Sequence, residues 1–165
     1  MIDPEYMIDS AIATLRAELP MRITAVNAEA GASLQLLTPS TTDGFLFAGK
    51  DPIVSYPSVE VAIADVNLSN FDVSRYMNGD ASTPLIVAGW VQDNEKEALM
   101  RRAYRYGRAL GMVMLQDDAA GSGTRPTTAV FRFRPTDPDT RQGDAWTAAA
   151  LLIVTYESTV TNQAP

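Results

Sequence analysis

The chain contains neither cysteine nor histidine, and these two absences exclude more chemistry than any of its motifs supports. Without cysteine there is no disulfide, no thiolate metal site and no cysteine nucleophile. Without histidine there is no Ser-His-Asp triad, no histidine-ligated metal and no side chain that ordinarily titrates near neutral pH. An enzyme built on this sequence would have to work with carboxylates, lysine or tyrosine.

Long apolar runs and an excess of basic residues are lacking as well. No segment approaches the roughly 20 apolar residues that span a bilayer. The N-terminus carries Asp3, Glu5 and Asp9 where a signal peptide has basic residues. The 13 basic and 20 acidic residues give a net charge of −7, which disfavours a general nucleic-acid binder. We therefore expect no membrane partner, no specific nucleic-acid binding, and a cytoplasmic protein unless it leaves within an assembly.

The stretch from residue 84 to residue 116 is the centre of the predicted fold. Residues 85–91 are a short apolar run typical of a strand, and residues 93–116 have the period of a long helix. Asp93 or Asn94 is suited to cap the start of this helix. The apolar stripe of the helix comprises Leu99, Ala103, Tyr106, Leu110 and Val113.

A first helix is predicted from the Asp-Pro-Glu start at residues 3–5, which combines an N-cap, proline at the first position and an early acidic residue. Its apolar stripe comprises Ile8, Ile12, Leu15 and Leu19. Pro20 is expected to end it, because the residue before a proline is pushed out of the helical region. The following segment, residues 22–26, is compatible with a short strand.

Residues 28–55 are rich in turn-forming clusters, and we expect an irregular arm with one small hairpin at most. A stretch this long without firm structure is usually functional or an interaction arm. Phe45 and Phe47 are its aromatic residues, and we consider them candidate contacts with a partner.

The remaining strands are predicted from alternation of apolar and polar residues. Residues 59–64 form one strand, and residues 67–83 are expected to be a loop or wide hairpin with a turn at Asn78 and Gly79. Residues 128–134 place Phe131 and Phe133 on one face, opposite Arg132 and Arg134. Residues 146–156 are apolar on both faces, which suggests a central strand covered on both sides. Residues 158–165 are expected to be a disordered tail.

Together these elements predict a single α+β domain over residues 1–165. It has two layers: a mainly antiparallel sheet of about four strands, with two helices packed on one face, and a long extended arm. Short polar links between the strands favour the antiparallel pairing.

No residue set points to catalysis, a cofactor or a metal. Residues 121–124 are Gly-Ser-Gly-Thr but lack the lysine and the preceding strand of a phosphate loop. Asp117 and Asp118, like Asp137 and Asp139, lack the spacing of an EF-hand.

Basic residues on the long helix are better candidates for a functional surface than these two motifs. Arg101, Arg105 and Arg108 share one face of the helix, away from its apolar stripe. This face is either solvated, with positive charge favoured towards the helix C-terminus, or a contact with an acidic partner surface. Among partners, another copy of this acidic chain is favoured over DNA. The candidate interface residues are Arg101, Arg105, Arg108, Arg132, Arg134, Phe45 and Phe47.

Three stretches carry a resemblance to a known family. The first helix ends at Leu19 and Pro20 before residues 23–29, an arm leads into residues 56–61, and the strand at 85–91 runs into the helix around residues 104–110. In this order and texture the chain resembles the tail terminator, or tail completion, proteins of tailed bacteriophages.

The resemblance implies a structural protein of the virion and not an enzyme. Such a protein forms a ring, commonly of six copies, that caps the tail tube and meets the head-side connector after assembly in the host cytoplasm. A ring requires head-to-tail contacts that close, which an arm, charged strips and an apolar sheet face could supply. Two alternatives stay open: another neck component, such as a head-tail connector or stopper, and a carboxylate-based enzyme or ligand-binding domain.

Overall fold

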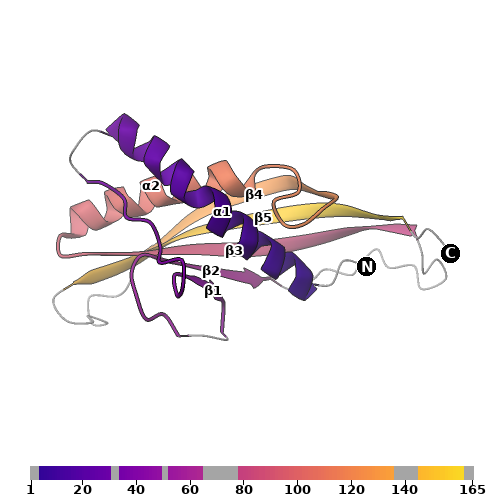
Figure 1. The fold of residues 1–165 in the computed structure, drawn as a ribbon, viewed down its shortest axis with the longest axis horizontal. Helices are drawn as coiled ribbons and strands as arrows, with labels where there is room; N and C mark the ends of the chain where they lie inside the picture. The colour runs from indigo at the N-terminus through magenta and orange to yellow at the C-terminus, as the bar shows by residue number, and fades with distance from the viewer. Residues whose placement is uncertain (1–3, 31–33, 50–51, 65–77, 136–144, 162–165) are drawn as a thin grey trace.

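The computed structural model describes residues 4–30, 34–49, 52–64, 78–135 and 145–161. It is an α+β fold, as the sequence predicts (Figure 1). The described elements are, in chain order, α1 (Pro4–Ala30), β1 (Phe45–Phe47), β2 (Ser58–Ile63), β3 (Asn78–Asp93), α2 (Lys96–Met114), β4 (Thr124–Pro135) and β5 (Trp146–Thr161).

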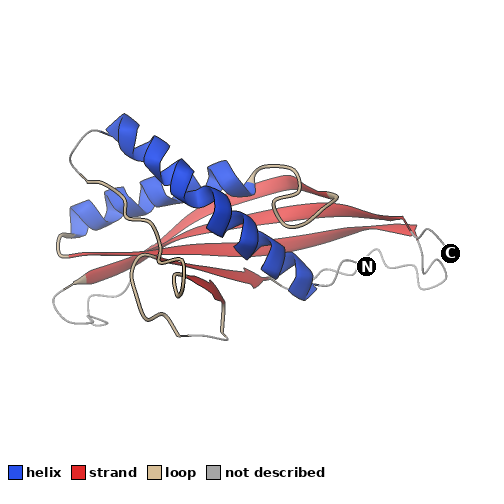
Figure 2. Ribbon diagram, viewed as in Figure 1, coloured by secondary structure: helices blue, strands red, loops and turns tan. Residues whose placement is uncertain are grey.

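The strands form one five-stranded sheet in the order β1-β2-β3-β5-β4. All neighbours pair antiparallel except β1 and β2, which are parallel. Both helices lie on one face of this sheet and contact each other, with α1 over β1 and β2, and α2 over β3, β5 and β4 (Figure 2). The sheet has one strand more than the four or so predicted, and the additional strand is β1.

The first helix does not end at Pro20, as the sequence suggested, but continues to Ala30. A proline inside a helix removes one backbone hydrogen bond and costs roughly 3 kcal/mol. The apolar stripe nevertheless continues through Ile23 and Val26, which are both buried in the core. The Thr24 hydroxyl donates a 3.0 Å hydrogen bond to the carbonyl of Pro20. Packing therefore outweighs the local signal, and the strand considered at residues 22–26 is helix.

Much of the segment expected to be an irregular arm is packed onto the domain. The side-chain amide of Asn27 donates to the carbonyl of Leu36 at 2.9 Å, and its oxygen accepts from the Leu36 N–H at 2.7 Å. Leu36 itself is in the core. The aromatic run pairs with β2 as the parallel strand β1, so the small hairpin considered there is wrong.

The central strands are longer than predicted because they pair with each other along their whole length. β3 and β5 each have 16 residues, and Asn78 of β3 pairs with Thr161 of β5. The turn predicted at Asn78 and Gly79 is therefore wrong, and β5 extends past Glu157, where the tail was expected to begin. The rest of the predicted loop, residues 67–77, lies outside the described residues.

The second helix has the buried stripe that the sequence predicts, with Leu99, Ala103, Tyr106, Leu110 and Val113 all in the core. Its cap differs. The N-cap is Glu95, without a side-chain cap hydrogen bond, while the Asp93 carboxylate accepts from the Glu95 N–H at 3.0 Å. Asp93 also pairs with Arg102 at 2.7 Å, which ties the end of β3 to the first turns of α2.

The core lies between the sheet and the two helices. β5 is a central strand, as predicted, with β3 and β4 as its neighbours. Its even-numbered residues from Ala148 to Tyr156 are buried under the helices, whereas Leu151 and Ile153 on the other face are half-buried. No helix of the described residues covers that second face, but Ala149 on it is fully buried, so the second face of β5 is covered at one end and only partly covered at Leu151 and Ile153.

A pair of glycines gives a test of the packing between α2 and the sheet. A Cβ at Gly89 in β3 would lie 2.7 Å from Cδ1 of Tyr106 and 2.9 Å from Cδ1 of Leu110. We expect Gly89→Ala to lower the free energy of unfolding by about 1–3 kcal/mol through overpacking.

Gly107→Ala is the matched control, because its Cβ would make only ordinary contacts, the nearest at 3.5 Å from Ala150. Removing a glycine from a helix interior favours folding by up to about 1 kcal/mol. Urea unfolding of both variants measures the difference. Equal stability of the two variants would contradict the close approach of β3 and α2.

Candidate interaction surface

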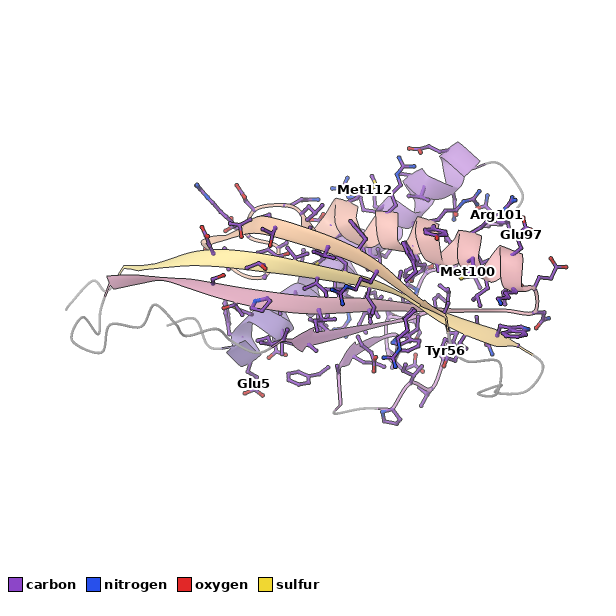
Figure 3. The ribbon with its side chains drawn as sticks, turned by 180° about the vertical axis from the view of Figure 1, so that it is seen from behind. Glu5, Tyr56, Glu97, Met100, Arg101 and Met112 are labelled. Carbon is purple, nitrogen blue, oxygen red and sulfur yellow. The ribbon has the colours of Figure 1, made fainter. Side chains whose placement is uncertain are left out.

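The three arginines predicted to form a partner contact on α2 all have partners within the chain. Arg101 pairs with Glu97 at 2.5 Å on the exposed side of the helix (Figure 3). Arg108 pairs with Glu29 of α1 through both guanidinium nitrogens, at 2.5 and 3.1 Å. Arg105 donates to the carbonyl of Leu34 at 2.8 Å. Arg105 and Arg108 thereby link α2 to α1 and to the segment that follows it, and any partner contact would compete with these bonds.

Arg132 and Arg134 are in a different situation. Both are exposed on β4, on the face of the sheet that points away from the helices, beside Leu151 and Ala149 of β5. Among the residues that the structure describes, none forms an ion pair with either guanidinium. A contact of these two arginines with a partner stays a prediction.

The two predicted aromatic contacts lie within the fold. Phe45 is 6% exposed and belongs to the core, with the Arg16 guanidinium carbon 5.7 Å from its ring centre. Phe47 is half-buried and packs against the same core. Both rings stabilise the domain, and a role for them between subunits stays a prediction.

An open apolar groove between α2 and β4 was not predicted from the sequence. We refer to it as the α2–β4 groove. Its lining residues are Tyr104, Arg108, Gly111, Met112, Leu115, Phe131 and Phe133, around a volume of about 490 Å³. Three of its apolar side chains are largely solvent-exposed: Tyr104, Leu115 and Phe131. The groove is a shallow surface of the kind that proteins use to bind other proteins.

Glycines on α2 create this groove. A Cβ at Gly111 would lie 2.9 Å from Cζ of Phe131, so the phenylalanine ring lies directly against the helix backbone. One turn earlier, a Cβ at Gly107 would lie 3.6 Å from both Phe131 and Phe133, so both rings also pack beside the helix there. The Tyr104 and Phe133 rings are 4.0 Å apart at an interplanar angle of 55°. Gly107 and Gly111 are four residues apart and therefore lie on one face of α2, and Phe131 and Phe133 alternate along β4. These two patterns together are the sequence signal for the groove.

The groove adjoins the open edge of the sheet. β4 has 12 residues and, among the described strands, pairs only with β5, so its outer backbone groups have no strand partner there. The opposite edge is formed by β1, which has only three residues. Strand β4 carries Arg125, Arg132 and Arg134 and has a register shift at Pro126. Charges and irregularities of this kind protect an edge strand against indiscriminate pairing.

A second cavity, of about 180 Å³, lies between the segment 35–37, the Tyr56–Pro57 turn, the end of β3 and α2. Tyr106 is one of its lining residues. The Tyr106 hydroxyl is buried without a hydrogen-bond partner among the described groups, and burial raises the pKa of this phenol. Ligand sites usually have volumes of roughly 300–1,000 Å³. In the described part of the chain no cluster of acidic side chains could hold a metal ion.

None of the described helices is long and apolar enough to cross a membrane. The fold and the groove thus define a class: an α+β domain with an open, apolar groove at one sheet edge.

Comparison with known proteins adds little to this class. No protein-family model matches the chain, and no curated protein is significantly similar to it in sequence. Among solved structures, it is similar to a chain described as "Virion of native gene transfer agent (GTA) particle". The similarity covers 87% of this chain and 95% of that chain, with 15% sequence identity and a TM-score of 0.43. A similarity this weak establishes neither fold nor function, so both are argued from this chain's own residues.

Two buried tyrosines give a test of hydrogen bonding in the core. The Tyr156 hydroxyl donates to the carbonyl of Met114, whereas the Tyr106 hydroxyl has no described partner. We expect Tyr156→Phe to lower the free energy of unfolding by about 0.5–1.5 kcal/mol. Tyr106→Phe should leave it unchanged or raise it slightly, because only an unpaired polar group is removed. Chemical denaturation measures both, and a larger loss in Tyr106→Phe would show that its hydroxyl is bonded after all.

The same two tyrosines predict how stability changes in alkali. Burial raises the pKa of both phenols above the ordinary value of 10.0, so the unfolded chain ionises first as pH rises. The unfolded state then binds fewer protons than the native state, and stability falls above about pH 10 by up to about 1.4 kcal/mol per pH unit for each phenol. We expect a shallower fall in Tyr106→Phe, measured as midpoint shifts between pH 9 and pH 11. An unchanged slope would contradict the burial of this phenol.

Proposed function

We propose that this chain is a structural protein of a tailed-phage-like particle: a tail terminator that forms a ring, caps the tail tube and meets the head-side connector. The observation that carries the proposal is the α2–β4 groove, which is apolar, open and placed beside an unpaired edge strand. The resemblance of the sequence to tail terminator proteins supplies the particular role. The same reasoning assigns the protein to the virion, after assembly in the host cytoplasm.

The two edges of the sheet favour head-to-tail association. One edge carries the α2–β4 groove. Near the other edge, the segment between β1 and β2 presents Val54, which is 66% exposed. If the second surface of one copy fills the groove of the next, the same contact repeats from copy to copy. Contacts of this kind build a ring when the rotation closes, and a filament when it does not.

The arginines predicted on α2 could exchange their partners within the chain for partners on a neighbouring copy. Arg101 and Arg108 are both more than half exposed in their pairs with Glu97 and Glu29. Exposed ion pairs of this kind contribute about 0–1 kcal/mol each, so a neighbouring copy can take over one partner at small cost. Arg108 also lines the groove itself. We include Arg101 and Arg108 in the proposed subunit interface on this basis. Arg105, which is half-buried and bonded to Leu34, is included on the sequence pattern alone.

Absence of catalysis is part of the proposal. Its support is the lack of cysteine and histidine in the whole sequence, together with the small size of the cavity beside Tyr106. Another neck component, a connector or stopper, would use the same class of contacts. The two roles are distinguished by whether the purified chain binds the open end of assembled tail tubes or the head-side connector.

Mass measurement tests ring formation directly. The net charge of −7 makes separate copies repel, and salt screens this repulsion. We expect light scattering to show a species of about six copies that grows with concentration and ionic strength, with an open centre in electron micrographs. A mass of 17.9 kDa, that of one chain, up to the solubility limit at every salt concentration would contradict self-assembly into a ring.

A matched pair on β4 tests whether the groove makes the ring contact. Phe131 and Val130 are adjacent and similarly exposed, at 43% and 47%, but they lie on opposite faces of the strand. Phe131→Glu places a charge in the groove, so we expect it to abolish the ring while the circular dichroism spectrum stays native. Val130→Glu, on the other face, should leave the ring intact. Loss of the ring in Val130→Glu alone would move the contact away from the groove.

A further inference from the structure

The face of the sheet that points away from the helices is largely apolar, and we refer to it as the open face. In Figure 3 its strands lie in front of α1. Its central apolar residues are Ala62, Ile86, Ala88, Val130, Leu151 and Ile153. Several of these are only half-buried, and Val130 is 47% exposed. A sheet with one solvated face normally carries polar residues there, so these side chains require an explanation.

The strand registers arrange this face in rows that cross β2, β3, β5 and β4. One row consists of Ala62, Ile86, Ile153 and Val130. The next consists of Glu60, Ala88, Leu151 and Arg132. The second row is apolar in the middle and oppositely charged at its two ends. The acidic end is on β2 and the basic end is on β4.

The opposite charges at the two ends of this row favour one arrangement in which two copies of the chain pack through their open faces. Two sheets that pack face to face lie about 10 Å apart with strands at about −30°. A twofold axis between two such sheets runs either across the strands or along them. An axis across the strands places β4 on β4 and brings Arg132 near its own copy. An axis along the strands, between β3 and β5, places β4 on the partner's β2 and brings Arg132 over Glu60.

We propose that a second copy of this chain packs on the open face about a twofold axis parallel to the strands. Each Arg132 then pairs with Glu60 of the other copy, so two ion pairs flank an apolar centre. Along the second row, Leu151 lies over the small side chain of Ala88. Along the first row, Val130 lies over Ala62, and Ile153 over Ile86. The contact is self-complementary in charge and in size, as a twofold interface requires.

The acceptor at Glu60 is already oriented for this contact. Its Oε2 accepts a 2.7 Å hydrogen bond from Nε1 of Trp90, which restricts the carboxylate on the open face. Arg132 has no described partner within its own chain and is exposed at the opposite edge. The proposed pairing therefore uses a positioned acid and an available base. It is independent of the ring contact, because the α2–β4 groove lies on the other face of β4.

The absence of native cysteine makes a cross-linking test unambiguous. Glu60 and Arg132 are in the same row but three strand spacings apart, about 14 Å within one chain. A disulfide needs Cα atoms within about 7 Å, which is too short for two sheets about 10 Å apart, so a bifunctional thiol reagent with a span of about 8 Å is used on a Glu60→Cys, Arg132→Cys double variant. This span is too short to join the two positions within one chain, and we expect the reagent to give a covalent dimer on a denaturing gel. Each single variant should remain monomeric on the same gel.

Three outcomes would overturn the proposal. The first is no covalent dimer in the double variant while its circular dichroism spectrum stays native. The second is a dimer in Arg132→Cys alone, which indicates pairing of β4 with β4. The third is a cross-linked product that is unaffected by Val130→Glu on the open face but lost in Phe131→Glu, which would assign the contact to the groove.

Charge reversal provides a second measurement that needs no cross-linking. Arg132→Glu or Glu60→Arg alone brings like charges together at both ends of the interface, and we expect dimerisation to weaken at least about tenfold in sedimentation. The double variant Arg132→Glu, Glu60→Arg restores opposite charges and should recover dimerisation. Lys96→Glu at the start of α2 is the control, because it makes the same charge change away from the open face and outside the proposed ring contact. Failure of the double variant to recover would contradict this pairing.

Discussion

The antiparallel pairing of β3 with β5 is the interaction on which the rest of the structure depends. Asn78 pairs with Thr161 at one end of this ladder and Asp93 pairs with Trp146 at the other. β3 leads directly into α2, and the Asp93–Arg102 ion pair holds that junction. Because α2 packs on these two strands, their register decides which residues face the helix. The short strand β1 and the helix α1 are then placed at one side of the ladder, and β4 at the other.

Features decided within one turn or one strand could be predicted from the sequence, whereas features decided by distant partners could not. The stripe of α2 from Leu99 to Val113 follows from helical spacing alone, and it is buried as expected. Pro20 and the pair Asn78 and Gly79 are strong local stop and turn signals. Both are overruled, the first by the buried residues Ile23 and Val26 and the second by a strand partner more than 80 residues away. Local preferences of a few kcal/mol yield to tertiary packing of this extent.

The residues of the candidate interaction surface could likewise be predicted only in part from the sequence. The alternation of Phe131 and Phe133 with Arg132 and Arg134 was readable from the sequence, and so was the separation of these residues onto two faces. That Gly107 and Gly111 of α2 lie beneath the two phenylalanines depends on the crossing of helix and strand, which no local pattern encodes. Conversely, Arg105 and Arg108 have the sequence signature of a free basic strip, but they bond to Leu34 and Glu29. A sequence pattern can predict that a charged side chain lies on the outer face of a helix. It cannot predict which groups from distant parts of the chain will bond to that side chain.

A sheet covered by helices on one face has two different surfaces for self-association, and they differ in symmetry. A groove at one edge that accepts the opposite edge gives a polar ring, whose two sides are different. A face that meets itself about a twofold axis gives a pair whose two members are equivalent. A protein that joins a tail tube on one side to a connector on the other requires the polar arrangement, because its two partners differ. If both contacts exist, the twofold pair must therefore open before the ring can join two unlike partners. Two ion pairs around a narrow apolar centre, as proposed for the open face, would suit such a reversible contact.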